Sequence, residues 1–470
     1  MIKLGKYFIL SLLIFKIPQF KSYSIEIKGT KASFDQNIYK LSLESCLKIA
    51  IQNSTDILKQ NSFNELNGVQ VLRNYANFLP NLTTQVAANY TTGTSYLTTA
   101  TPTYVNSSGT TSTISISSNF NIFNGFSDTS SLESYLLKKD ASEFTLNQVK
   151  QQIVLDIVQN YLQIILDNKM IEIAEQNLQE SETREKLLTA QSRLGSKSIA
   201  DLYLQQSQTS SAESYLQTLK NKIRNDQIIL LQKLRLDIQK NYKFTEVNLE
   251  QTQSEKKYED ENEIIKLALN KRLDLKASQR LTKASKYDIE VAKSGYYPKI
   301  DFMVSASSSG AILDTQTVNG NNVVPNSQDN LNDQLFSNIK YNFGLTFSWT
   351  VFDRLVTYAN VKQSTTTSYQ LKLDEENINA KVLADARTAF GNYKLAIQEL
   401  ESSAKGIFAS QKAYQVMTGR YKVGSASFID LMTAQSNLVQ AESTRAQALI
   451  NFKLQNWNIR YATGDLEIKN

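Results

Sequence analysis

The side chains that most often carry out enzyme chemistry are scarce in this sequence. It contains no histidine and a single cysteine, Cys46. This excludes imidazole metal ligands, Ser-His-Asp and Cys-His nucleophiles, a histidine general base and an internal disulfide. Paired carboxylates can still do acid–base chemistry, as in a secreted carboxylate enzyme, but no polar cluster on a concave scaffold supports that reading. We expect no enzyme, no cofactor and no metal site.

Two glycine turns are the polar motifs that stand out. Leu194-Gly195-Ser196 is followed by Asp201, and Val423-Gly424-Ser425 by Asp430, six residues after each glycine. Glycine just past a helix end is ordinary capping chemistry, and the helix dipole favours an aspartate in a first turn. From these residues alone, a structural and a functional role are both open.

Composition predicts long helices. The 470 residues include only 16 Gly and 5 Pro, and neither type occurs between positions 126 and 194. A helix over 127–192 would be roughly 100 Å long. The formal charge of +6 is dilute over this length, so we expect no nucleic-acid partner.

The N-terminus reads as a secretory signal peptide over 1–24. Lys3 and Lys6 precede an apolar run over 7–15, and Ser22–Ser24 offers a cleavage region. No cysteine follows closely, which argues against a lipid anchor. Beyond this segment no apolar run reaches the roughly 18 residues of a membrane-spanning helix.

The chain is internally duplicated. Leu79-Pro80 corresponds to Tyr297-Pro298 at a shift of 218 residues, and both glycine turns with their following Asp-Leu correspond at a shift of 229. Each half reads helix, β-hairpin, long helix, helix. The halves span 25–240, with a hairpin over 81–124, and 263–464, with a hairpin over 299–353. An equatorial segment, 241–262, separates them, and a tail, 465–470, ends the chain.

The strands carry the functional signal. Over 341–351 large apolar residues alternate with small polar ones such as Thr346 and Ser348. This pattern is typical of a transmembrane barrel strand, with lipid on one side and water on the other. We therefore expect lipid-facing side chains at Phe343, Leu345, Phe347 and Trp349.

Long polar loops, 91–113 and 307–338, are expected within the two hairpins. A soluble sandwich is the competing interpretation, but four strands flanked by very long helices argue against it. Four strands cannot close a barrel, and an open edge cannot face hydrocarbon. Several copies must therefore pool their strands.

The order of these features, repeated twice, resembles the TolC family of outer-membrane efflux proteins. The resemblance runs from Lys40 to Gly464. It implies a mixed, mainly α fold: a homotrimer with a 12-stranded β-barrel in outer-membrane lipid, four strands per chain, continued by a periplasmic α-helical barrel with coiled-coil tips. It also implies a passive duct of a tripartite efflux or type I secretion system. The tips would meet a periplasmic adaptor, a membrane fusion protein, and an inner-membrane pump of the RND, ABC or MFS type.

The resemblance also assigns residues. The adaptor-contacting tips would be Leu194, Gly195, Ser196, Val423, Gly424 and Ser425. In the periplasmic gate, Tyr421 would hydrogen-bond Asp201, and the two ring aspartates of the family fall on Asp430 and Thr433. The family's gate arginine falls on Ala426 and its threonine partner on Ala200, so this link is missing. The alternative function is a surface-exposed structural coiled-coil protein without a channel.

Overall fold

The computed structural model describes most of the chain. The described residues are 39–97, 103–245, 258–318, 321–322 and 330–466. The expected signal peptide, 1–24, lies outside them. So do parts of the equatorial segment, of the C-terminal tail and of the two predicted loops.

The first half of the chain contains a broken helix, a β-hairpin, a very long helix and a shorter one. In order, its elements are β1 (Tyr39–Leu41), α1 (Leu43–Asn53), α2 (Thr55–Ala76), β2 (Thr83–Leu97), β3 (Thr103–Phe123), α3 (Ser127–Arg193) and α4 (Ile199–Leu234).

The second half repeats this order with two additions inside its hairpin, β6 and α7. Its elements are β4 (Tyr242–Phe244), α5 (Glu261–Lys271), α6 (Leu273–Lys293), the 3-10 turn η1 (Ser294–Tyr296), β5 (Lys299–Val318), β6 (Asn321–Asn322), α7 (Leu331–Ser337), β7 (Ile339–Ser348), α8 (Val356–Lys422) and α9 (Phe428–Ala462). Both α3 and α8 have 67 residues, which makes each about 100 Å long. The fold is thus mainly helical with a few strands.

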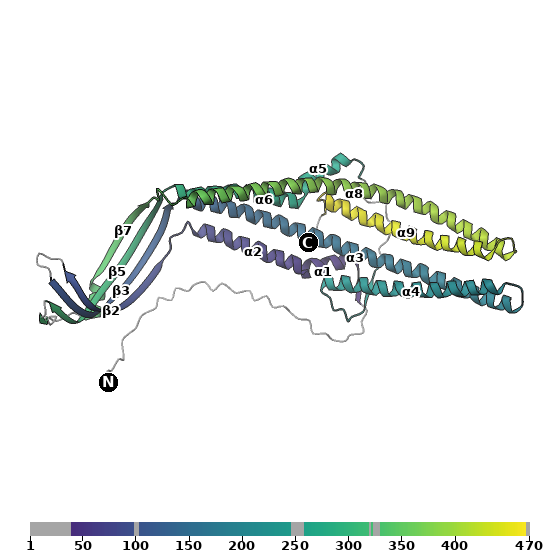
Figure 1. Ribbon diagram of the computed structural model, residues 1–470, viewed down its shortest axis with the longest axis horizontal. Helices are drawn as coiled ribbons and strands as arrows, with labels where there is room; N and C mark the ends of the chain where they lie inside the picture. The colour runs from purple at the N-terminus through teal and green to yellow at the C-terminus, as the bar shows by residue number, and fades with distance from the viewer. Residues whose placement is uncertain (1–38, 98–102, 246–257, 319–320, 323–329, 467–470) are drawn as a thin grey trace, which may run out of the picture.

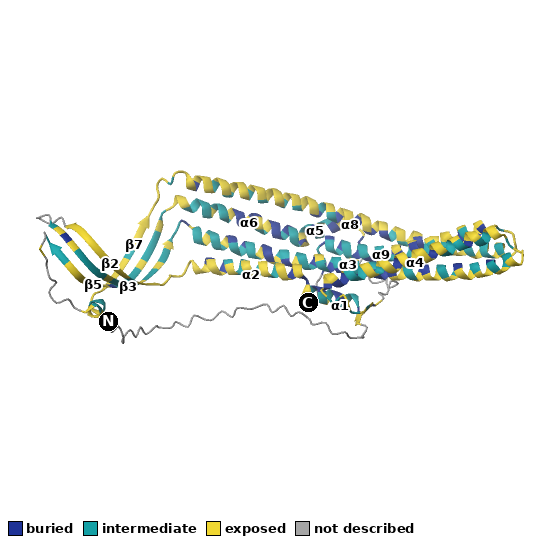
Figure 2. Ribbon diagram, turned by 60° about the horizontal axis from the view of Figure 1, so that its bottom comes forward, coloured by how far each residue is buried: buried dark blue, intermediate teal, exposed yellow. Residues whose placement is uncertain are grey.

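The molecule is elongated, with the sheet at one end and the helix turns at the other (Figure 1). Next to the sheet, α2 packs on α3, α3 on α6, and α6 on α8, so four helices lie side by side in one layer (Figure 2). Four long strands of the five-stranded sheet continue this layer in the same order, β2-β3-β5-β7, and the two-residue strand β6 pairs with the far end of β5. Toward the far end, α3 pairs with α4 and α8 with α9, and α9 also contacts α3.

The apolar core lies midway along the helices. One cluster gathers Val158, Tyr161 and Ile164 of α3 around Cys46 and Leu230, all almost fully buried. The Tyr161 hydroxyl lies 2.6 Å from the carbonyl oxygen of Thr245. This contact ties α3 to the parallel β1–β4 pair. A second cluster is formed by α5, α6, α8 and α9. Neither cluster reaches the sheet.

The predicted loops 91–113 and 307–338 are wrong for most of their length. β2 continues to Leu97, β3 begins at Thr103, and β5 extends to Val318. These stretches are rich in Thr and Ser, and β-branched Thr suits an extended strand. Small polar residues occupy both faces along much of these stretches, so no period-two pattern of apolar and polar residues marks them as strands. The polar composition of these stretches predicts loops, whereas the chain forms strands there.

The helix α7 lies inside the second predicted loop and covers an edge of β5. The Gln334 side chain donates to the carbonyl oxygen of Ala311 (3.1 Å) and accepts from its N–H (2.9 Å). This side chain thereby takes the place of a neighbouring strand on β5, beyond the point where the first residue of β7, Ile339, pairs with Ser308.

The first helix of each half, predicted as one, is two helices. The break falls at Ser54 in the first half and at Arg272 in the second, where the backbone is extended (ψ 126° and 125°). The second half also begins earlier than predicted, since α5 starts at Glu261, capped by the side chain of Asp260.

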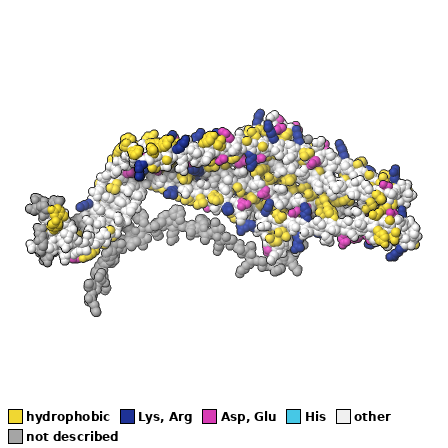
Figure 3. All heavy atoms as spheres, viewed as in Figure 1, with side chains coloured by type: hydrophobic (Ala, Val, Ile, Leu, Met, Phe, Trp, Pro, Cys, Tyr) yellow, Lys and Arg dark blue, Asp and Glu magenta, His cyan; other side chains and the backbone are white. Residues whose placement is uncertain are grey.

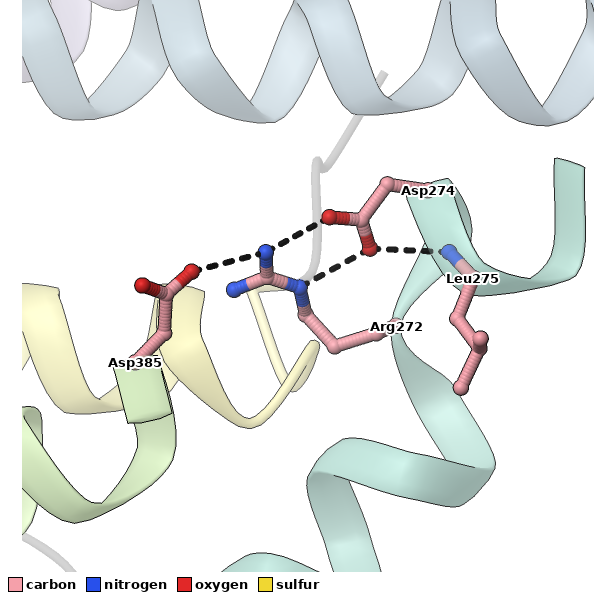
Figure 4. Close-up of polar contacts among 4 residues, drawn as sticks. All are labelled: Arg272, Asp274, Leu275 and Asp385. Carbon is pink, nitrogen blue, oxygen red and sulfur yellow. Dashed lines mark hydrogen bonds and ion pairs between the residues drawn. The ribbon is translucent and has the colours of Figure 1, made fainter. Parts of the chain in front are cut away.

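The second break holds a buried ion network (Figure 4). Arg272, 6% exposed, donates two hydrogen bonds to Asp274, at 2.9 and 2.6 Å, and one to Asp385 of α8 at 3.1 Å. Burial alone would raise the pKa of Asp274, but the hydrogen bonds from Arg272 outweigh it and hold that pKa below its ordinary value. The network therefore fixes the break against α8.

Replacing Arg272 by Met should lower the free energy of unfolding by about 3 kcal/mol, because it leaves the half-buried Asp274 carboxylate without its cation. Arg387→Met, which breaks an exposed pair with Glu261, is the matched control and should cost under about 1 kcal/mol. Since the pKa of Asp274 is lowered in the folded chain, its contribution is present above the ordinary Asp range. It should be lost as the pH falls through the folded pKa. Urea unfolding followed by circular dichroism, repeated across acidic pH, measures the free energy of unfolding of each variant and its pH dependence. Equal losses of unfolding free energy in the two variants contradict the assignment.

Candidate functional site

The two helix turns at the far end have the same backbone geometry. Gly195 and Gly424 adopt left-handed conformations with φ of 70° and 76°, which glycine reaches without strain. In each turn the next serine N–H donates back to the helix, Ser196 to Gln191 and Ser425 to Arg420, both at 2.9 Å. This double-bonded arrangement is a Schellman cap. It presents Leu194 and Val423, 83% and 79% exposed, at the extreme end of the molecule.

The two aspartates that follow these turns have different partners. Asp430 forms a capping box with Ser427: its carboxylate accepts from the serine N–H (3.1 Å) and hydroxyl (2.7 Å), and its own N–H donates to the hydroxyl oxygen. These bonds hold the pKa of Asp430 below its ordinary value. At the other tip, Ser198 caps α4 through Ala200 N–H, and no such box includes Asp201.

The expected hydrogen bond between Tyr421 and Asp201 is absent. The Tyr421 hydroxyl is buried and has no hydrogen-bond partner in the described part of the chain. Its ring instead contacts Phe428, at 5.8 Å between centroids, and carries the Lys197 ammonium 4.2 Å above its centre. Burial raises the pKa of this phenol. The hydrogen bond implied by the family resemblance is therefore not formed, and the Tyr421 ring is held by apolar and cation–π contacts.

Thr433, at the second ring position, is also satisfied locally. It lies exposed on α9, and its hydroxyl donates to the carbonyl oxygen of Ile429 (2.9 Å). The residues expected to form a gate therefore lie near the same end of the molecule, but no hydrogen bond among the described residues joins them to one another across the two tips.

A polar network between the two helical hairpins was missed by sequence reasoning. Arg184 of α3 donates to the hydroxyl of Tyr414 on α8 (2.9 Å) and to the side chain of Gln435 on α9. Tyr414 in turn donates to Glu180 (3.2 Å), and Gln435, 4% exposed, donates to Asn177 (3.0 Å). The duplication could not reveal it, because Arg184 corresponds to Ala413 in the second half.

The sheet separates apolar from polar side chains by face. Residues directly opposite each other share a face, and the register aligns Phe120, Phe302 and Leu345 in one row. Ile300–Phe347 and Val304–Phe343 form further apolar pairs on that face. Phe343, Leu345 and Phe347 are 65–72% exposed, although burying such side chains is favourable. The apolar face is thus uncovered in the single chain.

The opposite face of the sheet is mostly polar. One row aligns Ser117, Ser305 and Asn342, and the next aligns Ser115, Ser307 and Lys340. On the side shown in Figure 3, charged side chains are spread along the helices and are few over the sheet.

Trp349 does not belong to the strand, contrary to the predicted alternation up to position 351. β7 ends at Ser348, and the Trp349 indole N–H donates to the carbonyl oxygen of Tyr296 (3.2 Å). The chain then leaves the sheet to begin α8, so the apolar residues beyond 348 mark the junction and not the sheet.

Each sheet-to-helix junction uses two consecutive left-handed residues. These are Gly125-Phe126 and Arg354-Leu355, all with φ between 57° and 68°. The preceding Asn124 or Asp353 side chain caps the helix by accepting from the N–H four residues later (3.3 and 2.6 Å). The Phe-Asn and Phe-Asp pairs of the duplication thus start the long helices.

Two further features, metal-binding clusters and membrane-spanning helices, are absent from the described residues. No three His, Cys, Asp or Glu side chains among them lie close enough to hold a metal ion. None of the described helices combines the length and apolar character that a transmembrane helix needs.

Comparison with known proteins places these features in a family context. The outer membrane efflux protein family model matches residues 46–234 and 264–465. The outer membrane protein TolC of Salmonella enteritidis is 24% identical over 206 residues, which cover 44% of this chain and 40% of TolC. The curated relative is thus matched over less than half its length.

Two solved structures share the fold. A membrane protein from Pseudomonas aeruginosa has a TM-score of 0.78 at 15% identity, covering 92% of this chain and 94% of that one. The Campylobacter jejuni CmeC outer membrane channel has a TM-score of 0.76 at 14% identity, covering 90% and 85%. At such identities the likeness shows the fold alone.

Arg184→Met should lower the free energy of unfolding by about 2 kcal/mol, since it removes hydrogen bonds from a charged donor and leaves the buried Gln435 oxygen unpaired. Tyr421→Phe removes a hydroxyl that has no partner, so we expect no loss of stability. Thermal and urea unfolding of the two variants make the comparison. A larger loss of unfolding free energy for Tyr421→Phe than for Arg184→Met would indicate that the Tyr421 hydroxyl does form a hydrogen bond. It would also contradict the stabilising role of the Arg184 network.

Proposed function

The chain belongs to the outer membrane efflux protein family, and on that premise we propose that three copies form a passive export duct through the outer membrane and periplasm. The observation that carries the proposal is the sheet: four long strands, one exposed apolar face and two outer strands, β2 and β7, each with an unpaired edge among the described residues. Such edges cannot face hydrocarbon. Pairing β7 of one copy with β2 of the next closes twelve strands with their apolar face outward.

The helices support the same assembly. The layer α2-α3-α6-α8 also has α2 and α8 as its outer helices, and α2 exposes Phe63, Leu66 and Leu72, each more than half accessible. A second copy would cover this face, because contiguous exposed apolar surface of this size is rare in monomers. Three layers would then close a helical barrel that continues the β-barrel. The length of α3 and α8, about 100 Å, suits a duct that crosses a periplasm.

The orientation follows from the proposed barrel. The polar hairpin ends, including Asn321, would face the exterior, and the helices would lie in the periplasm after export by the segment 1–24. A periplasmic adaptor would meet the glycine turns and connect the duct to an inner-membrane pump of the RND, ABC or MFS type. The chain itself does no chemistry in this scheme, since the pump supplies the energy.

The alternative, a surface coiled-coil protein without a channel, leaves the apolar sheet face unexplained. Detergent-resistant trimers in outer-membrane fractions that conduct ions in planar bilayers would support the duct. Monomers or non-conducting coiled-coil oligomers would support the alternative.

The two faces of β7 should respond differently to charge. Leu345→Arg puts a cation on the lipid side. Near the bilayer midplane it should destabilise the assembled barrel by roughly 2–4 kcal/mol. Thr346→Arg, its neighbour on the polar face, should assemble normally and change conductance. Trimer yield after heating in detergent and single-channel recordings measure both; equal assembly defects contradict the face assignment.

Ion selectivity should follow the aspartate ring at the proposed gate. Asp430→Asn keeps an acceptor for Ser427 and removes the charge, so it should weaken cation preference. Thr433→Asp adds a second carboxylate one helix turn further on and should strengthen it. Reversal potentials in a salt gradient report the change. If both variants have the wild-type reversal potential, neither position lines the narrowest point.

A further inference from the structure

We propose that a basic patch at mid-length binds peptidoglycan through the carboxylates of its stem peptides. The inference rests on the proposed function, because a duct that crosses the periplasm brings this part of the chain to the cell wall. The basic patch is defined here as residues 39–53 and 233–245, which comprise β1, α1, the end of α4 and β4. It lies midway between the sheet and the helix turns (Figure 1).

The basic patch concentrates the positive charge of the chain. Its two stretches hold six basic residues and two acidic ones, a net charge of +4, whereas the whole chain carries +6. Contacts bring the two stretches together: β1 pairs with β4, and the Arg235 guanidinium lies 3.5 Å from the carbonyl oxygen of Asn53. The basic residues are Lys40, Lys48, Lys233, Arg235, Lys240 and Lys243.

Two lysines of the patch are neighbours on one face of the β1–β4 pair. The register places Lys40 directly beside Lys243, and both are exposed. Like charges at such positions repel each other, and neither ammonium has an ion-pair partner in the described part of the chain. The strands are held together despite this repulsion, because the Tyr161 hydroxyl lies 3.1 and 2.6 Å from the carbonyl oxygens of Leu41 and Thr245. A bound anion would relieve the repulsion.

Protection of strand edges explains only part of this charge. Lysines on an exposed edge discourage pairing with other chains, which accounts for one lysine on each strand. Lys240 lies outside both strands, and its ammonium lies 5.2 Å from the centre of the Tyr39 ring, which holds the charge in place without neutralising it.

The duplicated scaffold does not require a basic surface either. The stretch 40–53 corresponds to 258–271 in the second half, at the shift of 218 residues. That stretch has four acidic residues, Glu259, Asp260, Glu261 and Glu263, against two lysines. The positive charge is therefore particular to the first half and points to an anionic partner.

The position of the patch selects among the anions of a cell envelope. α2, with 22 residues, separates it from the sheet by about 33 Å. Anionic lipid headgroups at the proposed barrel would thus lie about three Debye lengths away in 0.1 M salt. The β1–β4 pair is an addition to the four-helix layer and would narrow the duct on its inner side, so we place it on the outer side. Peptidoglycan is the extended carboxylate-bearing polymer that surrounds this side.

The test is co-sedimentation of the purified full-length protein, in detergent, with isolated sacculi. One preparation of sacculi is native; in the other the carboxylates are converted to amides with ammonium and a carbodiimide, which leaves the glycan strands intact. We expect native sacculi to retain at least about fivefold more protein than amidated sacculi, with a difference that shrinks as salt rises.

Charge reversal supplies the decisive variant. Lys40→Glu with Lys243→Glu should lower binding to native sacculi at least about fivefold, whereas a role in edge protection would tolerate either sign of charge. The matched control, Lys405→Glu with Lys412→Glu, makes the same change at exposed positions of α8 and should bind like the wild type. If the reversed protein does not fold, judged by circular dichroism, Lys40→Gln with Lys243→Gln should still lower binding.

Equal retention by native and amidated sacculi, retention by neither, or wild-type binding by the charge-reversed protein overturns the proposal. Conductance of the same preparations in planar bilayers separates this failure from failure of the duct. Wild-type protein that conducts but does not bind native sacculi rejects the peptidoglycan site alone. Wild-type protein that never conducts rejects the proposed function itself.

Discussion

The constraint on which this structure depends is that every backbone hydrogen-bonding group and every large apolar surface needs a partner, and one chain cannot supply them all. The chain forms a layer one element thick along much of its length, with four strands continued by four helices in the same order. The two largest buried clusters lie in the middle of the helices, and a smaller one joins α3 to α4 nearer the tips. Neither of the two main apolar clusters reaches the sheet, and in the proposed barrel other chains and the surrounding lipid would stabilise it.

The duplication supplies a common scaffold, and departures from it supply the particular contacts. Both halves use left-handed residue pairs to leave the sheet and Schellman caps to turn at the tips. Gly125 is required where the first junction packs on Tyr297, since a Cβ would meet that side chain at 2.8 Å. Its equivalent in the second half, Arg354, is not so constrained. Equivalent backbone positions thus carry different side chains wherever the surroundings of the two halves differ.

Polar side chains join the helices at a few buried points. Arg272 links the α5–α6 break to α8, and Arg184 links the two hairpins near the tips. Asp167 of α3, 1% exposed, pairs with Lys222 of α4, and burial raises its pKa. Buried ion pairs add little net stability but are costly to break. In helices that could slide along one another, such pairs specify register.

The sequence by itself determined the long helices, the two halves and the two faces of the sheet, because these depend on local composition and periodicity. Missing Gly and Pro predict α3, and alternation predicts that Phe343, Leu345 and Phe347 share a face. Polar strands such as the upper part of β5 leave no period-two signal, so their extent was decided by pairing with β3. The contacts of Tyr421 with Lys197 and of Arg184 with Tyr414 were likewise decided by tertiary structure, since each joins residues more than 200 positions apart in the chain. No local pattern encodes which side chain will lie opposite another once two helices have packed.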